Sequence, residues 1–251
     1  MPFDDDLGPV SPALRERLAP GGTLRAGINL SNFLLVSART DDGGPAGVSP
    51  DMARAIADRL DVGLRLVPYA SPALLADAAQ RDEWDVGLIG AEPQRAETIA
   101  FTPAYAEIEA TYLVPAGSSL NSIADVDAPG IRIAVTGGTA YGLWLDRNIQ
   151  RAELVRTATM DETFANFRDS GLDALAGLRM RLLADAPRLP GSRLLDGRFM
   201  AVQQAIGVPR RDDGLTEQAA AWLGCFVALA IASGFVADRI RHHGVTGLSV
   251  A

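Results

Sequence analysis

The chain has 251 residues, enough for one large domain or two small ones. Hydrophobic residues make up 48% and charged residues 22%, a balance that is typical of globular chains and excludes disordered and collagen-like classes. The net charge of −8 argues against proteins that bind nucleic-acid backbones or anionic membranes, because both need a basic surface.

Several common catalytic groups are missing from the sequence. The chain contains no lysine, which excludes Schiff-base chemistry and the lysine of a phosphate-binding loop. Its single cysteine, Cys225, excludes an intrachain disulfide and a cysteine-rich zinc site. The only histidines, His242 and His243, leave no basis for a catalytic triad or a multi-histidine metal site. We therefore expect no cofactor and no metal, and we favour a binding protein over an enzyme.

The first residues carry no secretory signal, because Met1 is followed by Pro2, Phe3 and three aspartates instead of a basic start and an apolar stretch. A short helix is predicted from Ser11 to Leu18. As written, the chain is expected in the cytoplasm; the alternative is a periplasmic protein whose signal was removed.

Strand and helix signals then alternate, which predicts an α/β architecture with parallel sheets and crossover helices. Ser49-Pro50 and Ser71-Pro72 each predict a helix start, with serine as the cap and proline in the first turn. Strands are expected at 23–28, 64–67, 85–89, 111–114, 131–135, 153–155, 172–176 and 193–195, with an extended stretch at 199–208. One helix is expected from Ala140 and a last one from Thr216 to Arg241.

The order of these elements and the residues at their joints resemble the periplasmic binding protein type 2 fold, and in particular the family 3 extracellular solute-binding proteins. The matching pieces are Leu24–Ile28, Gly47–Met52, Trp84–Ile89, Pro93–Arg95, Phe101–Tyr105, Leu113–Pro115, Gly138-Thr139 and Gly171–Leu175. The resemblance implies two lobes, each an open and mostly parallel sheet flanked by helices, with a ligand cleft between the lobes that closes by a hinge.

The resemblance also implies domain boundaries. Lobe 1 is expected at 1–113 and 208–251 and lobe 2 at 114–207, with hinge crossings near 112–116 and 204–209. Ligands of open α/β sheets bind at the carboxyl ends of the strands, so we expect the site there.

The strongest binding motif is the turn Gly137-Gly138-Thr139-Ala140, where a predicted strand leads into a helix. Such a turn presents unpaired backbone N–H groups and the positive end of the helix dipole, which suit a carboxylate. The resemblance implies that Gly138, Thr139 and Ala140 contact the ligand. On the residues alone, a tight turn capped by Thr139 is the favoured explanation of the motif, and the resemblance shifts the preference to ligand binding.

Two departures from the family pattern concern the ligand. The resemblance implies an arginine clamp for an α-carboxylate on the strand after Tyr105, but that position is Thr111, and no arginine lies between Arg95 and Arg132. It also implies an aspartate for an α-ammonium at the position of Leu178. An ordinary α-amino acid is therefore not the expected ligand.

Other candidate ligand-binding residues lie near the expected strand ends. They are Asn29, Asn32, Gly90, Glu92, Glu109, Thr111, Arg179 and Gln204. Glu107, Glu109 and Thr111 share one face of an extended segment. A desolvated glutamate would prefer a cationic or hydrogen-donating ligand. The alternative is that the glutamates are solvated and that the amides form turns.

These observations predict a solute-binding protein that captures a small polar ligand by hinge closure. The alternative is a lyase on the same fold, because cyclohexadienyl dehydratases resemble this family, with a cleft glutamate as general acid or base. The expected partners are a small polar molecule and, if the chain is exported, an ABC transporter permease, but no nucleic acid. The apolar last helix is either buried or faces a second copy, so both a monomer and a homodimer stay open.

Overall fold

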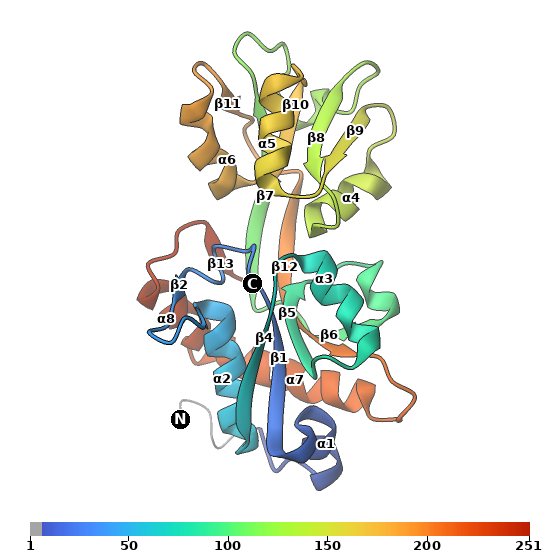
Figure 1. Ribbon diagram of the computed structural model, residues 1–251, viewed down its shortest axis with the longest axis vertical. Helices are drawn as coiled ribbons and strands as arrows, with labels where there is room; N and C mark the ends of the chain where they lie inside the picture. Colours follow the sequence, from blue (N-terminus) through green and yellow to red (C-terminus); the bar gives the residue numbers. More distant parts are fainter. Residues whose placement is uncertain (1–6) are drawn as a thin grey trace. The chain divides into compact units, whose positions relative to one another are not determined.

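The structure is a computed structural model that describes residues 7–251. The chain has a mixed α/β fold and packs as two compact units (Figure 1). Unit 1 comprises Met1–Glu107 and Gln203–Ala251, and unit 2 comprises Ile108–Val202. Both boundaries fall inside long strands, β7 (Ala106–Val114) and β12 (Met200–Pro209), so each of these strands contributes residues to both units. The lobe boundaries expected at 113/114 and 207/208 lie further along the same two strands.

Unit 1 is built on parallel strands flanked by helices. Its remaining strands are β1 (Thr23–Asn29), β2 (Ala38–Arg39), β3 (Pro45–Ala46), β4 (Gly63–Tyr69), β5 (Val86–Gly90), β6 (Ile99–Phe101) and β13 (Leu248–Val250). Strand β1 pairs in parallel with β4 and β5, and β12 runs antiparallel to β5. Its helices are α1 (Pro12–Leu18), α2 (Val48–Leu60), α3 (Pro72–Asp77), α7 (Thr216–Ala232) and α8 (Phe235–His242), with 3-10 turns η1 (Pro20–Gly22), η2 (Ala78–Arg81) and η3 (Arg95–Glu97).

Unit 2 repeats this organisation on a smaller scale. Its strands are β8 (Arg132–Thr136), β9 (Glu153–Thr157), β10 (Ala174–Leu178) and β11 (Arg193–Leu194), and its helices are α4 (Ala140–Asn148), α5 (Met160–Asp169) and α6 (Arg179–Asp185), with 3-10 turns η4 (Ile123–Asp125) and η5 (Ala186–Arg188). Strand β8 lies between β9 and β10 and is parallel to both, while β7 runs antiparallel to β10. Helix α5 packs across β8, β9 and β10, as Figure 1 shows.

Each unit has its own buried core. In unit 1, Trp84 is fully buried and its indole N–H donates to the carbonyl of Leu75 at 3.0 Å. In unit 2, Phe164 and Phe167 of α5 pack against Leu113 and Leu175 of the sheet. In unit 2 the face of α5 that carries the two phenylalanines therefore decides which side of the sheet is covered.

The Ser-Pro prediction of helix starts is confirmed at one site and corrected at the other. Ser71 caps α3, since its hydroxyl accepts from the N–H of Leu74. Ser49 is not a cap, because α2 begins at Val48 with Gly47 as the N-cap, and the Ser49 hydroxyl lies 2.9 Å from that of buried Tyr105. Gly47 has a φ of 147°, and a Cβ there would lie 2.3 Å from the carbonyl oxygen of Leu35. Only glycine fits this helix start.

The single helix predicted from Thr216 to Arg241 is wrong. Gly234 adopts a φ of 76° and separates α7 from α8, whose axes differ by 66°. Within residues 7–251 no single helix is long and apolar enough to cross a bilayer; only the bent pair α7–α8 meets the length and composition criteria.

Candidate functional site

The predicted residues of unit 1 gather at the carboxyl edge of its parallel strands. Strand β1 ends at Asn29 and β5 ends at Gly90, and because β12 is antiparallel to β5, Gln204 lies beside Gly90. Ile28 pairs with Leu88, so the two strands end at the same edge. This is the place where open α/β sheets leave room for a ligand.

The two asparagines of this edge hold the turn that follows β1. The side-chain oxygen of Asn29 accepts from the backbone N–H and the hydroxyl of Ser31 at 3.1 and 2.8 Å. Asn32 is buried, and its side-chain oxygen accepts from the N–H of Leu34. The turn-forming role that was the alternative for these amides is thus present. The neighbouring Phe33, which the sequence did not single out, is 38% exposed and offers an aromatic ring beside them.

Glu92 is buried together with an arginine that sequence reasoning did not place at the site. Arg95 is only 5% exposed, and its Nη1 donates to the carbonyl of Gly90 at 2.6 Å. Burial lowers the pKa of Arg95 to about 10, and the nearby charge of Glu92 opposes that shift. A cation of the chain therefore lies close to Glu92, so a cationic ligand is not needed to balance this buried carboxylate.

Two glutamines of β12 complete the edge of unit 1. Gln204 is buried, and its carbonyl accepts from the N–H of Tyr105 at 2.8 Å. The side-chain amide of Gln203 donates to Glu107 at 2.8 Å. The amide of Gln203 is thus bonded to a carboxylate of the same unit.

In unit 2 the predicted residues also gather at a carboxyl edge. Strand β8 ends at Thr136 and leads through the Gly138 turn into α4, while the adjacent parallel strand β10 ends at Leu178 and leads into α6 at Arg179. Ala110 of antiparallel β7 pairs with Leu178, which brings Glu109 to the same edge. Three of the predicted features, the turn, Arg179 and Glu109, therefore meet at one edge.

Thr139 caps α4 as the alternative reading expected. Its hydroxyl accepts from the N–H of Gly142 at 3.1 Å and donates to the carbonyl of Thr136 at 2.8 Å. Gly138 supplies the turn with a φ of 68°, and Ala140 is the first helical residue. Burial raises the pKa of Tyr141, against the hydrogen bonds of Thr136 and Thr139 that lower it. The hydroxyls of this turn form an internal network that holds the helix start in place.

We expect Thr139→Ala to lower the free energy of unfolding by about 1 kcal/mol, because α4 loses its cap and two buried hydrogen bonds lose their hydroxyl. Urea unfolding would measure the change. Thr139→Ser keeps the capping oxygen and should cost less than half as much. An equal loss in both variants would mean that the methyl group, not the cap, stabilises the turn.

Glu109 is held by two arginines. Arg179 Nε donates to one of its oxygens at 2.6 Å, and Arg198 Nη1 lies 3.7 Å from the other. Arg179 also donates through Nη2 to the carbonyl of Gly197 at 2.5 Å. Glu109 is half-exposed and its charge is balanced by cations of the chain, so a cationic ligand is not needed to compensate it.

Thr111 and Leu178, which stand where the family pattern implies zwitterion anchors, are both buried. Thr111 is 0% exposed and its hydroxyl donates to the carbonyl of Leu195 at 3.2 Å, so it contacts the protein interior and not a ligand surface. Leu178 is 5% exposed. Thr111 and Glu109 share a face of β7, but the chain around Leu195 covers Thr111 while Glu109 stays half-exposed, so Thr111 has no surface to offer a ligand in this structure.

Unit 2 also carries an aromatic group that the sequence did not single out. The ring of Phe199 lies 4.6 Å from that of Tyr112 and 5.4 Å from that of Trp144. These residues are far apart in the chain, and backbone bonds from Phe199 to Ala110 and from Leu195 to Tyr112 hold the segment of Phe199 beside β7. Such a group offers apolar contact to a ligand with a ring.

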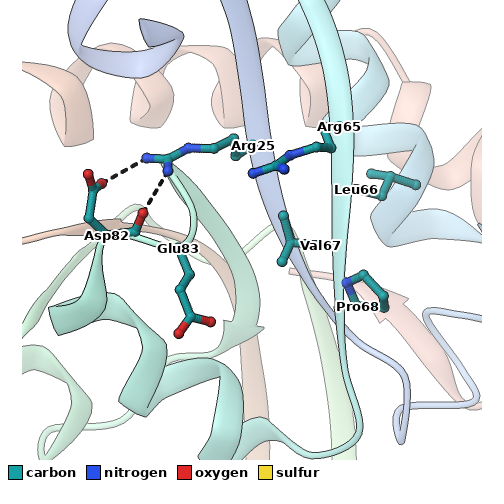
Figure 2. Close-up of a pocket in the computed structure, with 7 residues that line it drawn as sticks. All are labelled: Arg25, Arg65, Leu66, Val67, Pro68, Asp82 and Glu83. Carbon is teal, nitrogen blue, oxygen red and sulfur yellow. Dashed lines mark hydrogen bonds and ion pairs between the residues drawn. The ribbon is translucent and has the colours of Figure 1, made fainter.

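A surface pocket of about 420 Å³ lies elsewhere in unit 1, on the edge strand β4. Figure 2 shows its lining residues, Arg25, Arg65, Leu66, Val67, Pro68, Asp82 and Glu83. Arg25 donates to Asp82 there and to Asp85 beneath it. None of the residues predicted for ligand binding lines this pocket, and three of its charged residues, Arg25, Asp82 and Glu83, are engaged in ion pairs.

Comparisons with known proteins agree with this fold. The sequence profile of the bacterial extracellular solute-binding proteins, family 3, matches residues 24–226. A cyclohexadienyl dehydratase from Pseudomonas aeruginosa is 24% identical over 241 residues, which cover 90% of this chain and 84% of that protein. At 24% identity this likeness does not show a shared activity.

Two solved structures have the same fold. An ancestral amino acid-binding protein, a precursor of cyclohexadienyl dehydratase, superposes with a TM-score of 0.69 at 20% identity, covering 93% of this chain and all of the other. An amino acid ABC transporter substrate-binding protein from Streptococcus pneumoniae, bound to L-arginine, superposes with a TM-score of 0.68 at 19% sequence identity. The match covers 95% of this chain and 99% of the other.

Proposed function

Because the chain belongs to the bacterial extracellular solute-binding proteins of family 3, we propose that it captures a small polar solute with the carboxyl edges of both units. The observation that carries the proposal is that each unit ends its parallel strands in polar and charged groups, Arg95 and Gln204 in one and Arg179 and Thr139 in the other. In this proposal the ligand binds in a cleft between the units, which closes through β7 and β12.

The ligand in this proposal is not an ordinary α-amino acid. Leu178 is apolar and buried where an acceptor for an α-ammonium is implied, and Thr111 is bonded internally. The guanidinium groups of Arg95 and Arg179 support a ligand that carries hydrogen-bond acceptors. If the protein serves uptake, an ABC permease is its partner.

The proposal predicts that a small molecule copurifies with the full chain. Native mass spectrometry should find a bound species below about 1 kDa, the size of ligand that such sites enclose. Adding that compound to stripped protein should raise the melting temperature and reduce the radius of gyration in solution scattering, because ligand binding stabilises the closed state. A chain that neither carries nor is stabilised by any member of a metabolite library would contradict the proposal.

The second candidate is a lyase on the same fold, which the likeness to a cyclohexadienyl dehydratase favours. Glu109 is the half-exposed carboxylate that would act as general acid or base. Its pairing with Arg179 weighs against that role, because a proton donor would have to give up the ion pair. The lyase would become the favoured function if the protein converts the bound compound and the Glu109→Gln variant, while still folded, does not.

A further inference from the structure

The carboxyl edge of unit 2 has its acceptors engaged. Glu109 is bonded to Arg179, and Asp161 accepts from Arg181 Nη2 at 2.5 Å. Glu162 accepts from the backbone N–H groups of Ala158 and Thr159 in a capping box. These carboxylates are therefore already paired or hydrogen-bonded within the chain, which lessens their attraction for a ligand ammonium.

The same edge also carries a hydrogen-bond donor that is available to a ligand, on Arg179. Arg179 is fixed at two points, by Nε on Glu109 and by Nη2 on the carbonyl of Gly197. Its Nη1 group has no partner among the residues that the structure describes, and the side chain is 27% exposed. A guanidinium that is already oriented loses little conformational entropy when it binds an anion.

The position of Arg179 adds to this contrast between engaged carboxylates and an available guanidinium. It directly follows the buried Leu178 at the end of β10, the position where the family pattern implies an acid for an α-ammonium. The apolar Leu178 stands where that acid is implied, and the next residue is a cation, which favours a carboxylate over an ammonium at this edge.

We propose that the ligand is a small organic acid without an α-ammonium group, such as a 2-oxo or 2-hydroxy acid, and that its carboxylate binds Arg179. This inference rests on the proposed solute-binding function and names the ligand class of that site. The aromatic group of Tyr112, Trp144 and Phe199 makes acids with a ring part of that class.

Calorimetric titration of the stripped full chain with matched pairs of compounds tests this: phenylpyruvate against L-phenylalanine, 2-oxoglutarate against L-glutamate, and malate against L-aspartate. At least one acid should bind, and its amino partner should bind 10-fold more weakly or not at all. Arg179→Gln should weaken the acid by about 10- to 100-fold, the range for one hydrogen bond to a charged group. The affinity of Arg179→Lys for the acid should lie between those of the wild type and Arg179→Gln, because lysine keeps the positive charge but loses the planar guanidinium that binds a carboxylate through two N–H groups.

Arg168→Gln is the matched control, since Arg168 also pairs with a carboxylate of unit 2, Asp169, but at the end of α5 where the chain leads toward the opposite edge. It should leave the affinity unchanged. The inference is overturned if an amino acid binds as tightly as its acid partner, if Arg179→Gln has no effect, or if no acid of the panel binds. If native mass spectrometry then identifies a ligand of another class, the solute-binding function stands and only the ligand class is refuted.

Discussion

Replacing Arg95 by methionine is expected to lower the free energy of unfolding by about 3 kcal/mol, the lower end of the range for removing one partner of a buried ion pair. The substitution keeps most of the side-chain volume but leaves Glu92, which is 4% exposed, without the cation that balances it. It also removes the donor to the carbonyl of Gly90 at the end of β5. Chemical denaturation monitored by tryptophan fluorescence would measure the loss.

The double variant Arg95→Met/Glu92→Gln separates charge balance from packing. If the cost arises from an uncompensated carboxylate, the neutral glutamine should recover more than half of the lost stability. A double variant as unstable as Arg95→Met alone would contradict the pairing and point to packing around the guanidinium. Because both residues lie at the edge proposed for ligand binding, the same variants also report whether Arg95 contributes to affinity.

Asp85→Ala is expected to destabilise unit 1 by a similar amount, about 3 kcal/mol. Asp85 is fully buried and accepts from the backbone N–H, Nε and Nη2 of Arg25 at 3.0, 3.0 and 2.7 Å. These hydrogen bonds are the largest cause of a raised pKa for Arg25, against burial, which lowers it. The alanine variant would leave the backbone N–H and the Nε of Arg25 without their acceptor between β1 and β5, and the guanidinium would keep only its bonds to Asp82.

Asp82→Ala is the matched control, because Asp82 also binds Arg25 but is 67% exposed (Figure 2). An exposed ion pair contributes at most about 1 kcal/mol, so this variant should unfold close to the wild type. Measuring both in urea at low and high salt gives a second test, since salt screens the Asp82 pair and leaves the buried Asp85 pair nearly unchanged. Equal losses in the two variants would contradict the assignment of stability to the buried carboxylate.

The strand order and most element positions could be predicted because their signals are local. Alternating apolar runs predicted β1, β4, β5, β8 and β9, and the Ser71-Pro72 pair predicted the start of α3. The turn after β8 could also be predicted, because threonine preceded by glycine is a typical N-cap sequence at the start of a helix. The break at Gly234 was not, since the flanking residues are apolar on all sides and an isolated glycine is tolerated in a helix.

The charge of the candidate site was the least predictable property. Glutamates near strand ends were read as free acceptors, whereas Glu92 has Arg95 three residues away along a turn and Glu109 has Arg179 across the sheet, 70 positions away in the chain. No local sequence pattern indicates the pairing of Glu109 with Arg179. Thr111 was assigned to the ligand by alternation alone, and the carbonyl of Leu195 decided otherwise.

By itself, the sequence determined the α/β class, the family resemblance and the edges of the sheets where polar residues collect, since these follow from periodicity and from residue types at turns. Only the tertiary structure decided which charges remain available, because pairing depends on register and on strands that are distant in the chain. The antiparallel pairing of Ala110 with Leu178 brings Arg179 into hydrogen-bond contact with Glu109. Because of this contact, an edge whose sequence suggests acidic groups presents a guanidinium.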